Sequence, residues 1–264
     1  MKKIIANSSR IKNMYWNQLV SRLFPTKFQR LQKRLSTFGL DLDLKTGLLS
    51  YLPNFKSIRL NCDIVCFRHG ETNANKELRF QGQSNRVGWN DLNLKGQKDA
   101  IKTGKTLKQF IKQNQWDPDM ILTSPLKRAR ETCQIAVHCV DQVLPKPRIY
   151  SKLKEISFGR WENKAESEMT PSELIGVKNY RQKQQAIAKD QYGECFAELV
   201  LRVRKTLLNL SKKYPNKKIV IFGHGAWIQA ARVLVGMPVE ADRTLSWRNH
   251  NPIQNGQIYR IKRS

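Results

Sequence analysis

The sequence predicts an α/β fold: a three-layer sandwich with a mostly parallel central sheet flanked by helices, plus a basic helical N-terminal extension. Two observations predict it. From residue 63 onward, short apolar runs rich in β-branched residues alternate with longer segments of helical periodicity. The first 60 residues lack this alternation and are more densely basic. We therefore expect an extension over residues 1–60 and a domain over residues 61–264.

Five segments are predicted as strands. Asp63–Phe67 (DIVCF) and Met120–Thr123 (MILT) are short apolar runs, and Lys218–Phe222 (KIVIF) is the clearest buried strand. Arg148–Tyr150 follows two prolines, and Gly256–Ile261 is the last strand. Strands that alternate with helices are joined by crossovers, so most of this sheet is expected to be parallel.

Four segments between the strands are predicted as helices: Gly96–Phe110, Lys127–Val140, Phe196–Lys213 and Ala226–Val235. In the third, apolar side chains recur at helical spacing, namely Leu199, Val203, Leu207 and Leu210. The polar stretch 165–195 is rich in Gln and Lys and fits neither pattern well. We interpret it as a candidate lid whose bases could read a second anionic group on a substrate.

The extension over residues 1–60 holds 12 Lys and Arg but only two acids, Asp41 and Asp43. Apolar residues within it recur at helical spacing: Leu19, Val20, Leu23, Phe24, Phe28, Leu31, Leu35 and Phe38. Pro25 should begin or break a helix. We predict one or two basic amphipathic helices, then a loop around residues 52–54. Such a segment could bind an anionic membrane surface, direct the chain to an organelle, or dock on the body.

Composition limits the class of protein. The chain has 264 residues, of which 40% are hydrophobic, so a wholly disordered chain is excluded. Its 48 Lys and Arg against 21 Asp and Glu give a formal net charge of +27, which favours anionic partners: phosphorylated metabolites, nucleic acid or anionic lipid. A nucleic-acid partner is disfavoured because no known nucleic-acid-binding motif occurs and the aromatic residues do not cluster. The sequence leaves the oligomeric state open.

Localisation is predicted to be cytoplasmic. No apolar run reaches the roughly 18 residues of a membrane span. The five cysteines include no C-x-x-C pair, which favours a reducing compartment. Organellar targeting by the N-terminal segment stays an alternative, because the first 40 residues contain no acid.

The candidate catalytic and phosphate-binding side chains lie at or just beyond the ends of three predicted strands. Arg68 and His69 follow the first, Arg128 lies just beyond the second, and His224 follows the buried strand near the C-terminus. Carboxyl ends of parallel strands meet at one edge of a sheet, where ligands bind. Two imidazoles and two guanidiniums without metal-ligand spacing indicate a phosphate site with no metal and no cofactor. The arginine fork matches phosphoryl oxygens, and a neutral imidazole nitrogen can attack phosphorus.

Four stretches then give the sequence a likeness to a known family: RHGET (68–72), SPLKRARET (124–132), LKEISFGRWE (153–162) and GHG (223–225). In this order and at these spacings they resemble the histidine phosphatase superfamily, also called phosphoglycerate-mutase-like. RHG alone is a weak signal, whereas four blocks in order are strong. The likeness runs from residue 63 to the C-terminus, about three quarters of the chain.

The resemblance implies a role for each matching residue. His69 matches the catalytic nucleophile that becomes phosphorylated. Arg68 and Arg128 match substrate-binding residues that hold the phosphoryl group, and His224 matches a catalytic residue of the same pocket. We expect His224 to be protonated there and to stabilise charge on the phosphoryl oxygens.

A carboxylic acid must also protonate the leaving oxygen. Glu155 matches the family's proton donor, with Glu71 and Glu162 as nearby alternatives. Asn75 matches a substrate-contacting residue, and Thr72 is a second candidate for substrate binding; both could instead shape the loop. No metal is required, because the cationic side chains already supply the electrostatic stabilisation.

Two stretches depart from the family pattern. Trp161-Glu162-Asn163 stands where the family often has W-E-G, and the stretch after Gln83 is irregular. EISFG (155–159) replaces the E-R-H-Y-G run of the mutase branch. The sequence therefore predicts a metal-independent phosphomonoesterase acting through phosphohistidine on a small anionic phosphorylated metabolite. A phosphoglycerate mutase, an anionic membrane or nucleic-acid binding protein, and a scaffold without activity are the alternatives.

Overall fold

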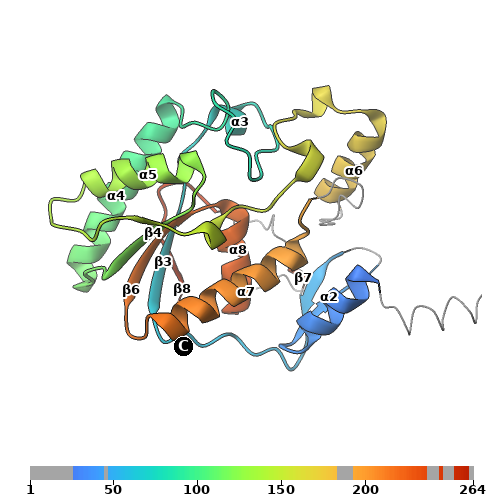
Figure 1. Ribbon diagram of the computed structural model, residues 1–264, viewed down its shortest axis with the longest axis horizontal. Helices are drawn as coiled ribbons and strands as arrows, with labels where there is room; N and C mark the ends of the chain where they lie inside the picture. The colour runs from blue at the N-terminus through green and yellow to red at the C-terminus, as the bar shows by residue number, and fades with distance from the viewer. Residues whose placement is uncertain (1–25, 45–46, 183–192, 237–243, 246–252, 262–264) are drawn as a thin grey trace, which may run out of the picture.

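The structure is a computed structural model that describes residues 26–44, 47–182, 193–236, 244–245 and 253–261 (Figure 1). No helix in these ranges is both long enough and apolar enough to cross a membrane.

A five-stranded sheet lies at the centre, in the spatial order β5-β4-β6-β3-β8. In chain order its strands are β3 (Asp63–Arg68), β4 (Met120–Thr123), β5 (Arg148–Ile149), β6 (Lys218–Gly223) and β8 (Tyr259–Ile261). The first four are parallel to one another, and β8 pairs with β3 in the antiparallel direction. These five strands were predicted from the sequence, and the mostly parallel sheet is confirmed.

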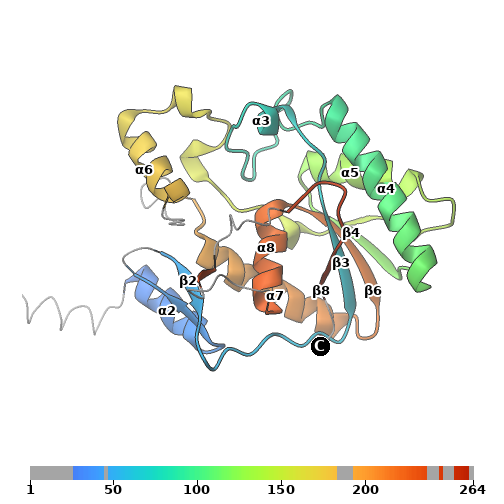
Figure 2. The ribbon, with the colours of Figure 1, turned by 180° about the vertical axis from the view of Figure 1, so that it is seen from behind.

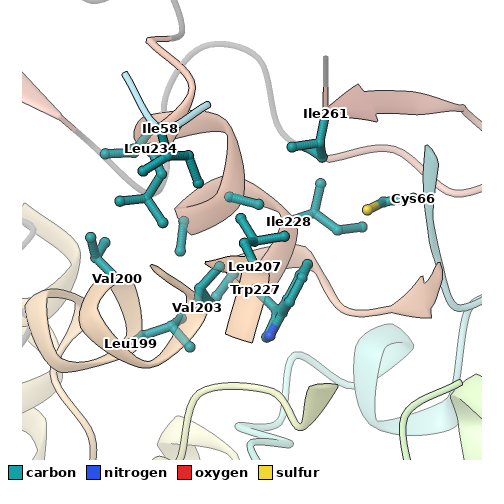
Figure 3. Packing of buried hydrophobic residues seen from close by; sticks show 14 of the residues in the cluster. Ile58, Cys66, Leu199, Val200, Val203, Leu207, Trp227, Ile228, Leu234 and Ile261 are labelled. Carbon is teal, nitrogen blue, oxygen red and sulfur yellow. The ribbon is translucent and has the colours of Figure 1, made fainter. Parts of the chain in front are cut away.

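Helices cover both faces of this sheet (Figures 1 and 2). One face carries α4 (Leu94–Asn114) and α5 (Lys127–His138), and the other carries α7 (Phe196–Lys213) and α8 (Gly225–Leu234). Side chains of β3 alternate between the two layers. Val65 and Phe67 pack with the α4–α5 layer, while Cys66 packs with the α7–α8 layer, as Figure 3 shows. The three-layer sandwich is therefore confirmed.

The helix boundaries follow local capping. The sequence predicts a helix that begins at Gly96, but α4 begins at Leu94. The Asn93 side chain caps it by accepting a hydrogen bond from the Gly96 backbone N–H at 2.8 Å. The helix ends at Asn114, and the next residue, Gln115, has φ of 47°. α7 matches its predicted bounds, Phe196–Lys213.

The described part of the N-terminal extension contains one of the predicted helices. α2 (Lys27–Ser36) begins with a capping box between Thr26 and Gln29. Its buried residues, Leu31 and Leu35, belong to the same core cluster as α7 and α8. The predicted helical residues 19–24 lie outside the described residues.

The second half of the extension is not helical. β1 (Leu40–Leu42) and β2 (Leu49–Tyr51) form an antiparallel hairpin that is joined by β7 (Thr244–Leu245). The expectation of helices followed by a loop missed this small sheet. The signal was the alternation of leucine and aspartate over residues 40–44, which has the period of a strand.

The extension is tied to the body by more than apolar packing. The Tyr51 hydroxyl donates to the Val233 carbonyl at 2.7 Å, and the Ile58 N–H donates to the Leu234 carbonyl at 2.9 Å. Both acceptors lie in the last turn of α8, so the hairpin and the connection that follows it satisfy carbonyls that a helix end leaves unpaired.

The candidate lid over 165–195 is described only in part. It contains a 3₁₀ turn, η3 (Glu166–Glu168), and α6 (Pro171–Gln182). The Gln- and Lys-rich residues 183–192 lie outside the described residues, so whether the segment acts as a lid stays a prediction.

Candidate active site

The register of the sheet brings the predicted site residues together. Arg68 pairs with Gly223 at the carboxyl ends of β3 and β6, so His69 and His224 leave the sheet side by side. Their ring centroids are 5.2 Å apart. β4 lies on the other side of β6 and delivers Ser124 to the same edge.

A pocket of about 260 Å³ opens at this edge. Five of the seven predicted site residues line it: Arg68, His69, Asn75, Arg128 and Glu155. The other two, His224 and Thr72, are buried and do not line it, and the His224 ring lies against the ring of His69.

The His69 ring is held in one tautomer. Its Nδ1 lies 2.7 Å from the Gly70 carbonyl oxygen, which can only accept, so Nδ1 carries the proton. Nε2 is then the basic nitrogen, and it accepts from Nε of Arg128 at 3.2 Å. Burial lowers the pKa of His69 well below its ordinary value, and the charges of Arg128 and Arg68 lower it further. A neutral imidazole with its nucleophilic nitrogen in a cationic pocket is the result.

His224 is also neutral in this environment. Burial lowers its pKa well below the ordinary value, helped by Arg128, His69 and Arg68. Its Nε2 lies 2.7 Å from the Ser124 hydroxyl oxygen. The expectation of a protonated His224 therefore does not hold for the pocket by itself. A phosphoryl group would add negative charge beside the ring and favour protonation.

Arg128 is fixed by backbone oxygens of the loop before α4. Its Nη2 donates to the Gly82 carbonyl at 2.7 Å, and its Nη1 donates to the Ser84 carbonyl at 3.2 Å. Burial lowers the pKa of Arg128 to about 10, which leaves the guanidinium charged at neutral pH. Arg68 donates from Nη1 to the Ile253 carbonyl at 2.8 Å, and burial lowers its pKa. Both guanidinium groups line the pocket beside the Glu155 carboxyl, and their positive charges suit a phosphoryl group.

Glu155 follows the 3₁₀ turn η1 (Ser151–Leu153), and its carboxyl group meets the first turn of α8. Oε1 accepts from the N–H groups of Ile156 at 3.0 Å and Trp227 at 3.2 Å, and Oε2 accepts from Ala226 at 3.2 Å. These bonds favour the carboxylate, but burial outweighs them and raises its pKa. A carboxyl with a raised pKa that lines the pocket can act as a general acid.

The two alternative acids lie elsewhere. Glu71 pairs with Lys95 and accepts from Asn93, which lowers its pKa. Glu162 accepts through Oε1 from the backbone N–H groups of Gln83 at 2.9 Å and Phe158 at 3.0 Å, so it holds two loops together. Neither lines the pocket.

Thr72 shapes the loop, as the sequence analysis allowed. It caps α3 (Asn73–Lys76) by accepting from the Asn75 N–H at 3.2 Å. The Gln81 side chain hydrogen-bonds to the Thr72 hydroxyl, and Asn75 donates to Gln81 Oε1 at 3.4 Å. Asn75 and Gln81 both line the pocket, so this network fixes the side chains of one part of its lining.

Sequence reasoning missed an apolar side of the pocket. Phe80, Ile156 and Phe158 line it, and the Phe80 and Phe158 rings meet edge to face with centroids 5.1 Å apart. Arg79 also lines it, but Glu77 and Glu168 each lie 2.6 Å from its guanidinium nitrogens. Ile156 and Phe158 lie inside a stretch that matches the family, and Phe80 comes just before Gln81-Gly82. These positions do not indicate which way the side chains point, so the sequence did not predict an apolar side.

Two backbone positions explain parts of the motifs. A Cβ on Gly70 would lie 2.2 Å from the Gly96 carbonyl oxygen, so the glycine after His69 is needed for close packing against α4. Asn163, where the family often has glycine, has φ of 70°, and asparagine tolerates this left-handed conformation. Its N–H donates to the Phe80 carbonyl at 2.7 Å.

Among the residues that the structure describes, no group of three or more His, Cys, Asp and Glu side chains gathers in a way that could hold a metal ion. Three guanidinium groups line the pocket, those of Arg68, Arg79 and Arg128, and the one of Arg79 is paired with Glu77 and Glu168.

Comparison with known proteins agrees with this geometry. Residues 64–261 match the histidine phosphatase superfamily, branch 1. The chain belongs to this family. A mannitol-1-phosphatase of Eimeria tenella is 28% identical over 249 residues, covering 82% of this chain and 79% of the relative. A protein of Escherichia fergusonii named as a probable phosphoglycerate mutase is 29% identical over 191 residues, covering 70% of this chain and 80% of its own.

The solved structures include similar histidine phosphatases. The alpha-ribazole phosphatase of Shigella flexneri superposes with a TM-score of 0.58 at 25% identity, over 75% of this chain and 89% of that one.

Proposed function

We propose that this histidine phosphatase hydrolyses phosphate monoesters of small metabolites through a phosphohistidine at His69, without a metal ion. One observation carries the proposal. His69 Nε2 lies beside Arg128 at 3.2 Å, with its proton held on the far nitrogen, in the same pocket as the Glu155 carboxyl.

The first step follows from this arrangement. The lone pair of His69 Nε2 forms a bond to phosphorus, and the bond from phosphorus to the ester oxygen breaks. Its electron pair stays on that oxygen, which takes a proton from Glu155 and leaves as the alcohol. Arg68 and Arg128 stabilise the charge on the remaining phosphoryl oxygens.

The second step returns the site to its starting state. The Glu155 carboxylate accepts a proton from water, the water oxygen bonds to phosphorus, and the bond from phosphorus to His69 Nε2 breaks. Inorganic phosphate is released and Glu155 is again protonated. A mutase would instead pass the phosphoryl group to a second hydroxyl of the substrate. The phosphatase is favoured because EISFG replaces the mutase run around Glu155 and because similar proteins include phosphatases.

The proposed substrate is a small phosphorylated metabolite. A pocket of about 260 Å³ accepts a molecule of that size, and its apolar wall of Phe80, Ile156 and Phe158 contacts the part beyond the phosphoryl group. The names of similar proteins include mannitol-1-phosphatase, metal-independent phosphoserine phosphatase and alpha-ribazole phosphatase, and all of these point to small phosphorylated metabolites. We also propose that basic residues of the candidate lid, 165–195, bind a second anionic group of the substrate.

An anionic membrane surface is a second proposed partner of the N-terminal extension. On α2, Arg30 and Arg34 are exposed and line a groove between α2 and α7. Its apolar residues Leu31 and Leu35 are buried in the core, so this helix would contact lipid headgroups through its cations and not by inserting an apolar face.

The test is phosphate release in EDTA from a panel of phosphate monoesters, comparing the wild type with His69→Ala. The panel includes mannitol 1-phosphate and 3-phosphoglycerate, with the products of the latter resolved to detect isomerisation. We expect turnover in EDTA that the substitution abolishes, and acid-labile ³²P on the wild-type protein after quenching. Turnover that survives His69→Ala would overturn the proposal.

A further inference from the structure

One side chain of α7, Arg202, holds the backbone of the stretch that carries Glu155. Its Nη1 donates to the carbonyl oxygens of Lys152 at 3.3 Å and Lys154 at 2.9 Å. Its Nη2 donates to the Glu155 carbonyl at 3.1 Å. Three carbonyl groups within four residues therefore share one guanidinium.

The remaining donors of Arg202 are fixed by Glu194. Nε lies 2.8 Å from Oε1 and Nη2 lies 2.7 Å from Oε2, in a two-point pair whose side chains are 24% and 16% exposed. The Glu194 N–H also donates to the Ser157 carbonyl at 2.8 Å. All five N–H donors of Arg202 are thus used, and the pair holds the chain on both sides of Glu155.

The opposite end of Glu155 is held by α8, whose N–H groups bind the carboxyl oxygens. α7 and α8 pack against each other through buried apolar side chains, among them Val203, Leu207 and Trp227 (Figure 3). The Trp227 indole N–H also donates to the Lys152 carbonyl at 3.1 Å. The backbone of Glu155 is therefore fixed by one helix and its carboxyl by the next.

We propose that Arg202, locked by Glu194, is a positioning residue that holds the Glu155 carboxyl where the leaving oxygen of the substrate is protonated. This inference rests on the proposed function. Arg202 does not line the pocket, so it acts through Glu155 and does not touch substrate.

The guanidinium fork is required for this role. A lysine ammonium at the same place cannot meet three carbonyls and a two-point carboxylate at once. Removing the fork takes one of two donors from the Lys152 and Glu155 carbonyls, which keep Trp227 and Gln83. It also takes the Arg202 donor from the Lys154 carbonyl and the cation from Glu194, so the 152–155 backbone can shift. A displacement of about 1 Å of a catalytic group can cost about 100-fold in rate.

The experiment compares Arg202→Met with Lys205→Met, an exposed base of the same helix that makes no hydrogen bond to residues 152–155. The quantity measured is kcat/KM, which covers the step in which the alcohol departs. Two substrates are used: glycerol 3-phosphate, whose alkoxide needs a proton to leave, and p-nitrophenyl phosphate, whose phenolate leaves readily without one. Glu155→Gln is run beside them to show the full effect of losing the acid.

We expect Arg202→Met to lower kcat/KM for glycerol 3-phosphate by about 10- to 100-fold while changing that for p-nitrophenyl phosphate little. Glu155→Gln shows the same preference more strongly, and Lys205→Met matches the wild type on both substrates. Because Arg202→Met leaves the Glu194 charge unpaired, the double variant Arg202→Met/Glu194→Gln is measured as well. It removes that charge and carries the test if the single variant does not fold.

An equal loss on both substrates, or no loss on either, would show that Arg202 has only a structural role and would overturn this inference alone. Failure of the proposed function gives a different result: the wild type would not turn over either substrate, or His69→Ala would remain active. In that case this inference falls with it.

Discussion

The two buried histidines of the site lie within 5.2 Å of each other and next to two guanidinium groups. Burial, and after it the positive charges of the two arginines, lower the pKa values of both rings and keep them neutral. For His69 this is the chemically useful state, because only the unprotonated Nε2 can attack phosphorus.

The same pKa shifts predict how stability depends on pH. His69 and His224 have folded-state pKa values well below 6.5, so below pH 6.5 the unfolded chain binds protons that the native chain does not. Stability therefore falls as pH is lowered from about 7 to 5, by up to about 1.4 kcal/mol per pH unit for each histidine. Denaturant unfolding at a series of pH values measures this slope.

The control for that prediction is the double variant His69→Asn/His224→Asn. Its slope between pH 7 and 5 should be shallower than that of the wild type, because the two groups no longer gain protons on unfolding. Parallel pH profiles for the two proteins would show that other groups cause the loss.

Among the elements of the fold, the loops that surround the pocket are joined by a few backbone contacts. Asn163 follows the 3₁₀ turn η2 (Gly159–Trp161) and pairs with Phe80 of the loop after α3. Its φ of 70° brings its carbonyl to Nη1 of Arg79 at 2.9 Å. The left-handed conformation of one residue thus fixes how the two loops meet.

Asn163→Ala should destabilise the protein by about 1–2 kcal/mol, because an alanine in this conformation brings Cβ too close to the following carbonyl. Asn163→Gly should lie within about 1 kcal/mol of the wild type, since glycine adopts this φ freely. It loses only the bond that Oδ1 accepts from Asn90 at 3.0 Å. Urea unfolding of the three proteins distinguishes these outcomes, and equal stability of the two variants would contradict the argument.

At the scale of the whole molecule, the hydrophobic core of the domain also includes residues of the N-terminal extension. The cluster that contains Leu199 of α7 and Leu234 of α8 also contains Leu35 of α2 and Leu49 of β2. The family match begins only at residue 64, so part of the core lies on a segment outside the region matched to the family.

Leu35→Ala should therefore destabilise the body and not only the extension. Leu35 is fully buried, and such truncations cost about 2–5 kcal/mol. We expect a lower midpoint for a single transition seen by both far-ultraviolet circular dichroism and tryptophan fluorescence. Leu44→Ala, at a residue that is 43% exposed, should behave like the wild type. Two separate transitions would show that the extension unfolds independently.

The sequence by itself determined the layered sheet, the order of its strands and helices along the chain, and four side chains at or near its carboxyl edge, Arg68, His69, Arg128 and His224. This was achievable because periodicity and strand ends are local properties of the chain, and parallel strands bring their ends together. The family likeness then separated Glu155 from Glu71 and Glu162, although it could not show why.

Only the tertiary structure decided the rest. Glu155 differs from Glu162 because backbone N–H groups in the first turn of α8, 71 and 72 residues away in sequence, bind its carboxyl group. His224 is neutral because burial lowers its pKa, and the charge of Arg128 lowers it further. Arg202 reaches the Glu155 backbone across 47 residues of sequence. The hairpin at 40–51 is completed by β7 from near the other end of the chain. Each of these depends on which distant groups share a desolvated space, and a linear pattern carries no such information.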